Sequence, residues 1–78
     1  MLTVLRVGPY RFFFYSGDGG EPPHVHIERD AQIAKVWLEP VRLVRSGGFR
    51  RRELRTIEDL VSENKEELLE SWNEFFDA

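Results

Sequence analysis

The antiparallel sheet of this protein is encoded most clearly in HVHIERDAQIAKVWL, residues 24–38. Apolar and polar residues alternate on both sides of Asp30-Ala31, a pattern that is typical of two strands joined by a two-residue turn. With this turn, the register pairs His24 with Trp37, His26 with Lys35, Glu28 with Ile33 and Arg29 with Gln32.

One face of this hairpin is apolar, and the other carries both histidines of the chain. Because alternate residues of a strand point to opposite faces, we expect the core face to carry Val25, Ile27, Ala34 and Val36. The opposite face, which we expect to be exposed, carries His24, His26, Glu28, Lys35 and Trp37. A slip of one residue would exchange the two faces, so the position of the histidines depends on this register.

The segments on either side of the hairpin predict an α+β fold. Residues 3–7 and 10–15 are two strand-like runs separated by Gly8-Pro9, and residues 41–45 form either a short further strand or an irregular turn. Apolar residues then recur three, four or seven apart, which predicts helices over residues 49–63 and 65–76. Asn64 and Glu67 fit an N-cap with a capping box, and a single helix containing Asn64 is the alternative. We therefore expect an antiparallel sheet of about four strands followed by two C-terminal helices packed on one face.

Size and composition predict a single domain over residues 1–78. The chain has no cysteine, so neither a disulfide nor a thiolate zinc site can stabilise it. Aromatic residues make up 13% of the chain and must supply much of the core. No apolar run approaches the roughly 18 residues that a membrane span requires, and the N-terminus lacks the apolar region of a signal peptide. We therefore expect a cytoplasmic protein without membrane association.

Charge is divided unevenly along the chain. Residues 1–57 carry ten basic and six acidic side chains, a net charge of +4, whereas residues 58–78 carry one basic and eight acidic side chains, a net charge of -7. This division indicates a basic surface suited to a polyanion and a separate acidic helix face. The arginines expected to bind phosphates are Arg42, Arg45, Arg50, Arg51, Arg52 and Arg55. The alternative is that they pair with Glu53, Glu58 and Asp59.

Three segments resemble a known family. The motif EPPHVH at residues 21–26, the strand AKVWL at residues 34–38 and the segment EELLESW at residues 66–72 are similar to small bacterial proteins of the domain-of-unknown-function family 4160. Members of that family are grouped with toxin–antitoxin pairs and are commonly found beside a second small protein. The resemblance implies a toxin-like role that acts on RNA, with a small antitoxin-like protein as the cognate partner.

His24 and His26 are the candidate catalytic residues. Two imidazoles can divide the acid and base steps of metal-independent RNA cleavage near neutral pH, and Lys35 can stabilise the charge that develops on the phosphate. Trp37, beside His24, would offer a stacking surface for a base. This hypothesis of an endoribonuclease requires both imidazoles to be exposed.

Three other interpretations of the histidines remain open. They could share a zinc ion at about 2.0–2.1 Å, but this site needs a third ligand, and Glu28 lies about 13 Å from His24 along the strand. The sequence does not decide whether that ligand would come from the helices or from Asp18, Glu21 or Glu39, so we assign no metal and no cofactor. The histidines could also hydrogen-bond a neighbouring loop in an edge strand. Finally, the protein could be a non-enzymatic module that binds a partner protein or self-associates as a homo-oligomer.

Overall fold

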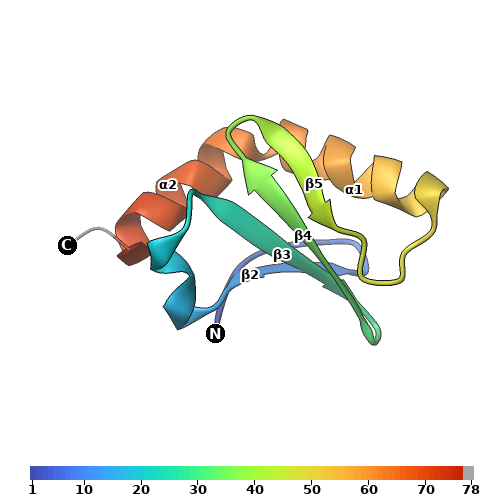
Figure 1. Ribbon diagram of the computed structural model, residues 1–78, viewed down its shortest axis with the longest axis horizontal. Coiled ribbons are helices and arrows are strands. Elements are labelled where there is room, and N and C mark those ends of the chain that lie inside the picture. The colour runs from blue at the N-terminus through green and yellow to red at the C-terminus, as the bar shows by residue number, and fades with distance from the viewer. Residues whose placement is uncertain (77–78) are drawn as a thin grey trace.

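Five antiparallel strands form one sheet in which each strand pairs with the next one along the chain, and two helices follow (Figure 1). The computed structural model describes residues 1–76. The elements are β1 (Leu2–Val7), β2 (Tyr10–Phe14), the short 3-10 helix η1 (Ser16–Gly20), β3 (His24–Arg29), β4 (Gln32–Leu38), β5 (Val41–Arg45), α1 (Arg51–Glu63) and α2 (Lys65–Phe76). The α+β class is confirmed. The sheet has five strands rather than about four because residues 41–45 pair with β4.

The hairpin of β3 and β4 has the predicted register. His24 lies opposite Trp37, and His26 lies opposite Lys35. Asp30 begins the turn with a φ of 57°, a left-handed conformation that aspartate tolerates in two-residue turns. The four residues predicted to face the core are fully buried: Val25, Ile27, Ala34 and Val36.

The core lies between the sheet and the two helices, which pack on the same face of the sheet (Figure 1). β2 lies inside the sheet, and its Phe12 and Phe14 are fully buried in this core. The buried residues of the helices belong to the predicted apolar stripe and are Ile57, Val61, Leu68 and Trp72. Phe75, at the end of the same stripe, is 39% exposed.

The two helices meet at Asn64, whose role differs from the predicted one. Asn64 is the C-cap of α1, and its side-chain amide donates to the carbonyl oxygen of Leu60 at 2.8 Å. The carbonyl of Asn64 accepts the N–H of Leu68 at 2.9 Å, which begins α2. The short amide side chain therefore serves a nearby backbone group at the end of α1, instead of forming a capping box at the start of α2. Neither helix of the described chain is long and apolar enough to cross a membrane.

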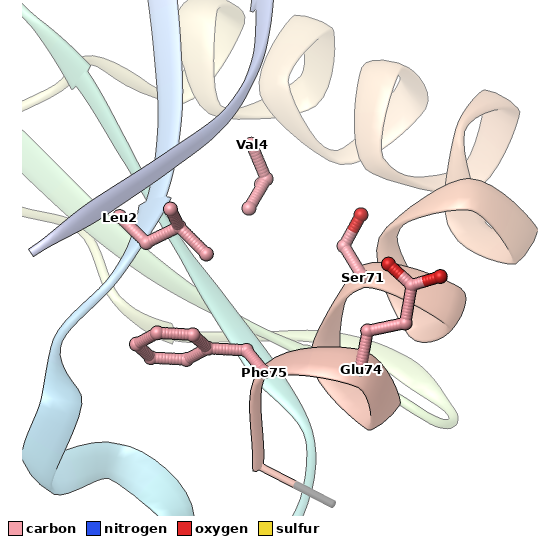
Figure 2. A pocket seen from close by; sticks show the side chains of 5 residues that line it. All are labelled: Leu2, Val4, Ser71, Glu74 and Phe75. Atoms are coloured by element: carbon pink, nitrogen blue, oxygen red, sulfur yellow. The ribbon is translucent and has the colours of Figure 1, made fainter.

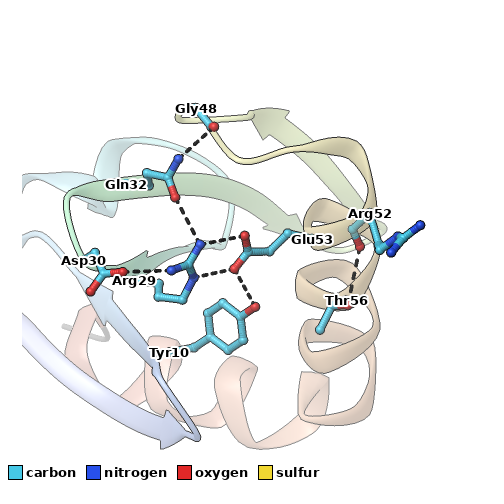
Figure 3. A network of polar contacts seen from close by, with 8 residues as sticks. All are labelled: Tyr10, Arg29, Asp30, Gln32, Gly48, Arg52, Glu53 and Thr56. Carbon is cyan, nitrogen blue, oxygen red and sulfur yellow. Dashed lines mark hydrogen bonds and ion pairs between the residues drawn. The ribbon is translucent and has the colours of Figure 1, made fainter.

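Glu53 connects α1 to the sheet (Figure 3). Its Oε1 accepts from Arg29 Nη2 at 2.8 Å, and its Oε2 accepts from Arg29 Nε and from the hydroxyl of Tyr10. The hydrogen bonds from Arg29 and Tyr10 lower the pKa of Glu53. Gln32 extends the network, because its amide contacts both Arg29 and the carbonyl of Gly48. This network holds the β5–α1 loop against the sheet.

The β5–α1 loop passes very close to β4 at Gly47. Its φ is 61°, and a Cβ at this position would lie 1.8 Å from the carbonyl oxygen of Ile33. Because a side chain would overlap the backbone of β4, only glycine fits here. The close approach at Gly47 fixes the course of the loop between Arg45, the last residue of β5, and the start of α1.

Candidate functional site

The histidine face of the sheet is covered at His24 and His26. The expectation that both rings are exposed is wrong, since His24 is fully buried and His26 is only 7% exposed. Part of the cover comes from η1, which brings Asp18 within 3.2 Å of His24 and 3.1 Å of His26. The segment between β2 and β3 therefore folds over the start of β3 instead of leaving this face open.

Aromatic rings complete the cover of the two histidines. The ring of His24 lies 5.6 Å from the ring of Trp37 and 5.1 Å from that of Trp72, measured between centroids. The ring of Phe13 stacks on His26 at 5.4 Å, and the edge of Tyr15 meets His26 at 4.7 Å. The predicted proximity of Trp37 to His24 is confirmed. The two imidazoles therefore lie in a mainly aromatic environment.

Asp18 directs a single carboxylate oxygen at both rings. Its Oδ2 lies 3.1 Å from His26 Nε2 and 3.2 Å from His24 Nε2. The same oxygen accepts the backbone N–H of Tyr15 at 2.9 Å, which fixes the orientation of the carboxylate. Asp18, His24 and His26 thus form a cluster whose ligating atoms all lie within 4.8 Å of one another. We call these three residues the histidine–aspartate cluster.

The tautomer of His24 follows from its other ring nitrogen. Nδ1 lies 2.9 Å from the carbonyl oxygen of Pro22, and a carbonyl can only accept, so Nδ1 carries a proton. In the neutral ring, Nε2 then presents a lone pair to Asp18. Within residues 1–76, this Nε2 is the buried side-chain polar atom that has no hydrogen-bond partner. Such an atom is costly and is rare in folded proteins.

Burial and charge set the protonation of the other two members. Burial lowers the pKa of His26, although the nearby Asp18 carboxylate opposes this effect. Burial alone would raise the pKa of Asp18, but the backbone N–H of Tyr15 and the charges of the two histidines outweigh it and lower that pKa. At neutral pH the cluster therefore contains a carboxylate and a neutral His26.

Lys35 lies beside the cluster, but its charge is already paired. Its Nζ lies 2.6 Å from Glu21 Oε1, and this contact lowers the pKa of Glu21. The same ammonium lies 5.1 Å from the ring centroid of Trp37, which is half-buried. Trp37 and Lys35 therefore form the part of this sheet face that adjoins β5.

The predicted arginine patch is divided into two groups. Arg42 lies opposite Trp37 and Arg45 lies opposite Lys35, so both belong to the sheet face that the helices leave uncovered. The other four arginines lie at the start of α1: Arg50, Arg51, Arg52 and Arg55. Arg51 and Arg55 line a hollow together with Leu43 of β5. One group therefore belongs to β5, an edge strand of the sheet, and the other lies beside β5 at the start of α1.

These six arginines have no acidic partner within residues 1–76. The alternative of pairing with Glu53 fails because Glu53 binds Arg29, which offers it two parallel hydrogen bonds. Three other cations of the sheet are paired: Arg11 with Glu28, Arg29 with Glu53 and Lys35 with Glu21. The structure thus leaves unneutralised positive charge around β5.

A family model described as "Domain of unknown function (DUF4160)" matches residues 10–73. The chain belongs to this family. The match includes the histidine–aspartate cluster and all six arginines of this DUF4160 protein, and it begins after β1. No curated protein and no solved structure matches the chain.

Asp18 is the member of the cluster that the sequence of this DUF4160 protein did not single out. It was one of several possible third ligands, because it lies in a glycine-rich loop that has no periodic relation to β3. The signal that could have favoured it is the spacing to Tyr15, whose N–H it accepts at the start of η1. Sidechain-to-backbone bonds of this kind are common where aspartate begins a turn.

An apolar hollow lies between β1 and α2 of the DUF4160 chain (Figure 2). Leu2 and Val4 from β1 face Phe75 from α2 across it, with Ser71 and Glu74 at its side. Leu2 and Phe75 are 37% and 39% exposed. This hollow is a second surface feature, located at the opposite edge of the sheet from the arginines.

Proposed function

We propose that this DUF4160 protein is the toxin-like component of a bacterial two-protein module and that it binds RNA in the cytoplasm along β5. The observation that carries the proposal is the set of six arginines in and beside this strand that have no acidic partner among the described residues. Arginines that are not engaged within the protein can bind phosphates, and the counterions that they release from RNA favour binding. The acidic residues, by contrast, are concentrated in the two helices.

The surface around β5 also offers a ring to a base. Trp37 is half-buried on the uncovered sheet face and lies directly opposite Arg42. An aromatic residue beside a cation suits a single strand, because the base stacks on the ring while its phosphate meets the cation. The residues of the RNA site are therefore Trp37, Arg42, Arg45, Arg50, Arg51, Arg52 and Arg55.

RNA cleavage by His24, His26 and Lys35 has less support than RNA binding. A general acid and a general base must come within hydrogen-bond distance of the reacting oxygens. The burial of His24 keeps its ring from a phosphate, and Glu21 already neutralises Lys35. We therefore base the proposed toxin-like activity on RNA binding and assign it no reaction.

The proposal is tested by charge reversal on either side of β5. Affinity for a fluorescently labelled single-stranded RNA is measured by anisotropy at several salt concentrations for wild type, Arg42→Glu, Arg51→Glu and the control Arg6→Glu. Arg6 is exposed on β1, at the other edge of the sheet, so the control has the same change in charge. Each lost phosphate contact should reduce the slope of log affinity against log salt by about 0.7.

The expected result is weaker binding and a shallower slope for Arg42→Glu and Arg51→Glu, with Arg6→Glu close to wild type. Equal effects of all three variants would mean that only net charge matters, and the site along β5 would be wrong. The toxin-like role is measured separately as growth arrest on expression, with and without a co-expressed small antitoxin-like protein. Absence of arrest by a folded, RNA-binding wild type would reject that role.

The hollow between β1 and α2 favours a second candidate, a non-enzymatic module that binds a partner protein or itself. Exposed Leu2 and Phe75 would lose apolar surface in such a contact. A Phe75→Asp variant should then lose co-purification with a co-expressed antitoxin-like protein, or dissociate a homo-oligomer in size-exclusion chromatography. Retained assembly in both measurements would exclude this surface.

A further inference from the structure

We propose that Asp18, His24 and His26 form a site for one Zn²⁺ ion, which fastens η1 to β3. This site lies apart from the arginines around β5 and does not depend on RNA binding. Its three ligands would be the Oδ2 atom of Asp18 and the Nε2 atoms of the two histidines.

The two distances from Asp18 Oδ2 to the histidine nitrogens agree with tetrahedral coordination. A ligand bound to zinc at about 2.0–2.1 Å is separated from its neighbour in a tetrahedron by about 3.3–3.4 Å. Asp18 Oδ2 lies 3.2 Å from His24 Nε2 and 3.1 Å from His26 Nε2. These two separations therefore need to change by only a few tenths of an ångström, and all three ligand atoms lie within 4.8 Å of one another.

His24 provides the observation that points to a cation. Its Nδ1 donates to the carbonyl of Pro22, which leaves the fully buried Nε2 to face the Asp18 carboxylate at 3.2 Å. Within residues 1–76, this Nε2 has no hydrogen-bond partner, and a buried polar nitrogen without one is costly. A metal ion between Nε2 and Asp18 Oδ2 would give both atoms a partner.

Two further contacts orient the ligands in the way that metal sites require. A histidine ligand commonly donates its second ring N–H to a carbonyl or a carboxylate, and Pro22 supplies that carbonyl for His24. The backbone N–H of Tyr15 holds Asp18 Oδ2 at 2.9 Å. Both supporting groups belong to the backbone, so the ligands are positioned before a metal ion arrives.

The donor set selects the kind of metal ion. Two imidazoles and one carboxylate suit Zn²⁺, whereas Mg²⁺ and Ca²⁺ prefer sites built from oxygen. Three protein ligands leave the fourth position to water, and the 15% exposure of the Asp18 side chain marks the side from which ion and water can enter. Glu28, on the same face of β3, is paired with Arg11.

The consequence of zinc binding is a link between η1 and β3. A small domain buries a limited core, and this chain has no cysteine that could form a disulfide. A metal ion held by Asp18 and by two residues of β3 would supply such a cross-link. We therefore expect Zn²⁺ to stabilise the protein and to order the loop that carries Asp18.

The test uses the full chain after removal of metal with a chelator. Isothermal titration calorimetry with Zn²⁺ should give one ion per chain, and Mg²⁺ should give no binding. Addition of Co²⁺, a spectroscopic substitute for Zn²⁺, should produce the visible absorption of a four-coordinate ion, which added Zn²⁺ displaces. Thermal unfolding should shift to higher temperature with Zn²⁺ alone.

Two ligand variants and one control assign the ion to this site. Asp18→Asn and His24→Ala should weaken Zn²⁺ binding by more than about 100-fold, the upper end of the loss seen when a supporting residue is removed. The control Glu28→Gln changes a carboxylate on the same strand face and should bind like wild type. If His24→Ala does not fold, Asp18→Asn and the Co²⁺ spectrum of wild type decide the question.

Either of two results would overturn the proposal. The first is a metal-free wild type that binds neither Zn²⁺ nor Co²⁺. The second is Zn²⁺ binding that Asp18→Asn leaves unchanged, which would place the ion elsewhere. Because RNA affinity is measured with other variants, failure of the zinc site and failure of the RNA site are distinguishable.

Discussion

Replacement of Gly47 by alanine should cause a large and diagnostic loss of stability. The added Cβ would lie 1.8 Å from the carbonyl oxygen of Ile33, and the backbone at this residue has a φ of 61°. Neither backbone can move freely, because one belongs to the loop that leads into α1 and the other to β4. The substitution therefore combines conformational strain with an overlap against the sheet.

The magnitude can be worked out from three glycines with different surroundings. Gly8 has a φ of 54° but no atom within 4 Å of a new Cβ, so Gly8→Ala measures the conformational strain alone. The strain costs about 1–2 kcal/mol. It is partly offset by about 0.4–1 kcal/mol, because alanine stiffens the unfolded chain. Gly20 has neither feature, and Gly20→Ala should be neutral or slightly stabilising. Gly47→Ala adds the overlap, about 1–3 kcal/mol or more, for a total of roughly 3 kcal/mol.

This loss is a large part of the roughly 4–12 kcal/mol expected for a domain of this size. Urea unfolding followed by the fluorescence of Trp37 and Trp72 would measure it. The midpoint of Gly47→Ala should fall by more than about 1 M, since the urea slope of a small domain is about 1–3 kcal/mol per M. A midpoint equal to that of Gly8→Ala would refute the close approach of the loop to β4.

Three further predictions follow from the fold and the proposed RNA site. Hydrogen bonds from Arg29 and Tyr10 lower the pKa of Glu53, so the stability that Glu53 contributes is complete above its ordinary pKa of 4.5 and is lost as the pH falls through the lowered pKa. In acid titrations, the difference in unfolding free energy between wild type and Glu53→Gln should therefore close in that pH range. A difference that does not depend on pH would contradict the contact. Phe12→Ala should cost about 3–5 kcal/mol by urea unfolding because the ring is fully buried, and a loss below 1 kcal/mol would be inconsistent with its place in the core. Trp37→Ala should weaken binding of single-stranded RNA by about 1–3 kcal/mol in the anisotropy assay, whereas unchanged affinity would remove the ring from the site.

The sheet could be predicted from the sequence because its signals are local. The alternation of side chains around Asp30-Ala31 placed His24 opposite Trp37 and His26 opposite Lys35, as the structure has them. Turn and strand signals of this kind involve residues that are adjacent in the chain.

The environment of the histidines could not be predicted because it depends on contacts across the fold. The loop that carries Asp18 has no periodic pattern, and α2 brings Trp72 to His24 from 48 positions further along the chain. The pairing of Glu53 with Arg29 could not be predicted from the sequence for a similar reason. The sequence places arginines of α1 close to Glu53, but Arg29 offers a bidentate contact that an exposed helix pair does not match.

The order of the strands has a consequence for the way the chain folds. Each strand pairs with its predecessor, and three of the four connections between strands are two-residue turns. Hairpins of this kind close within about 1–10 μs, so the sheet can assemble progressively as the chain leaves the ribosome. The helices are made after the sheet, and until they dock the side chains of Phe12 and Phe14 face solvent. The nascent chain is thus most prone to aggregation in the interval between completion of β5 and the docking of α2.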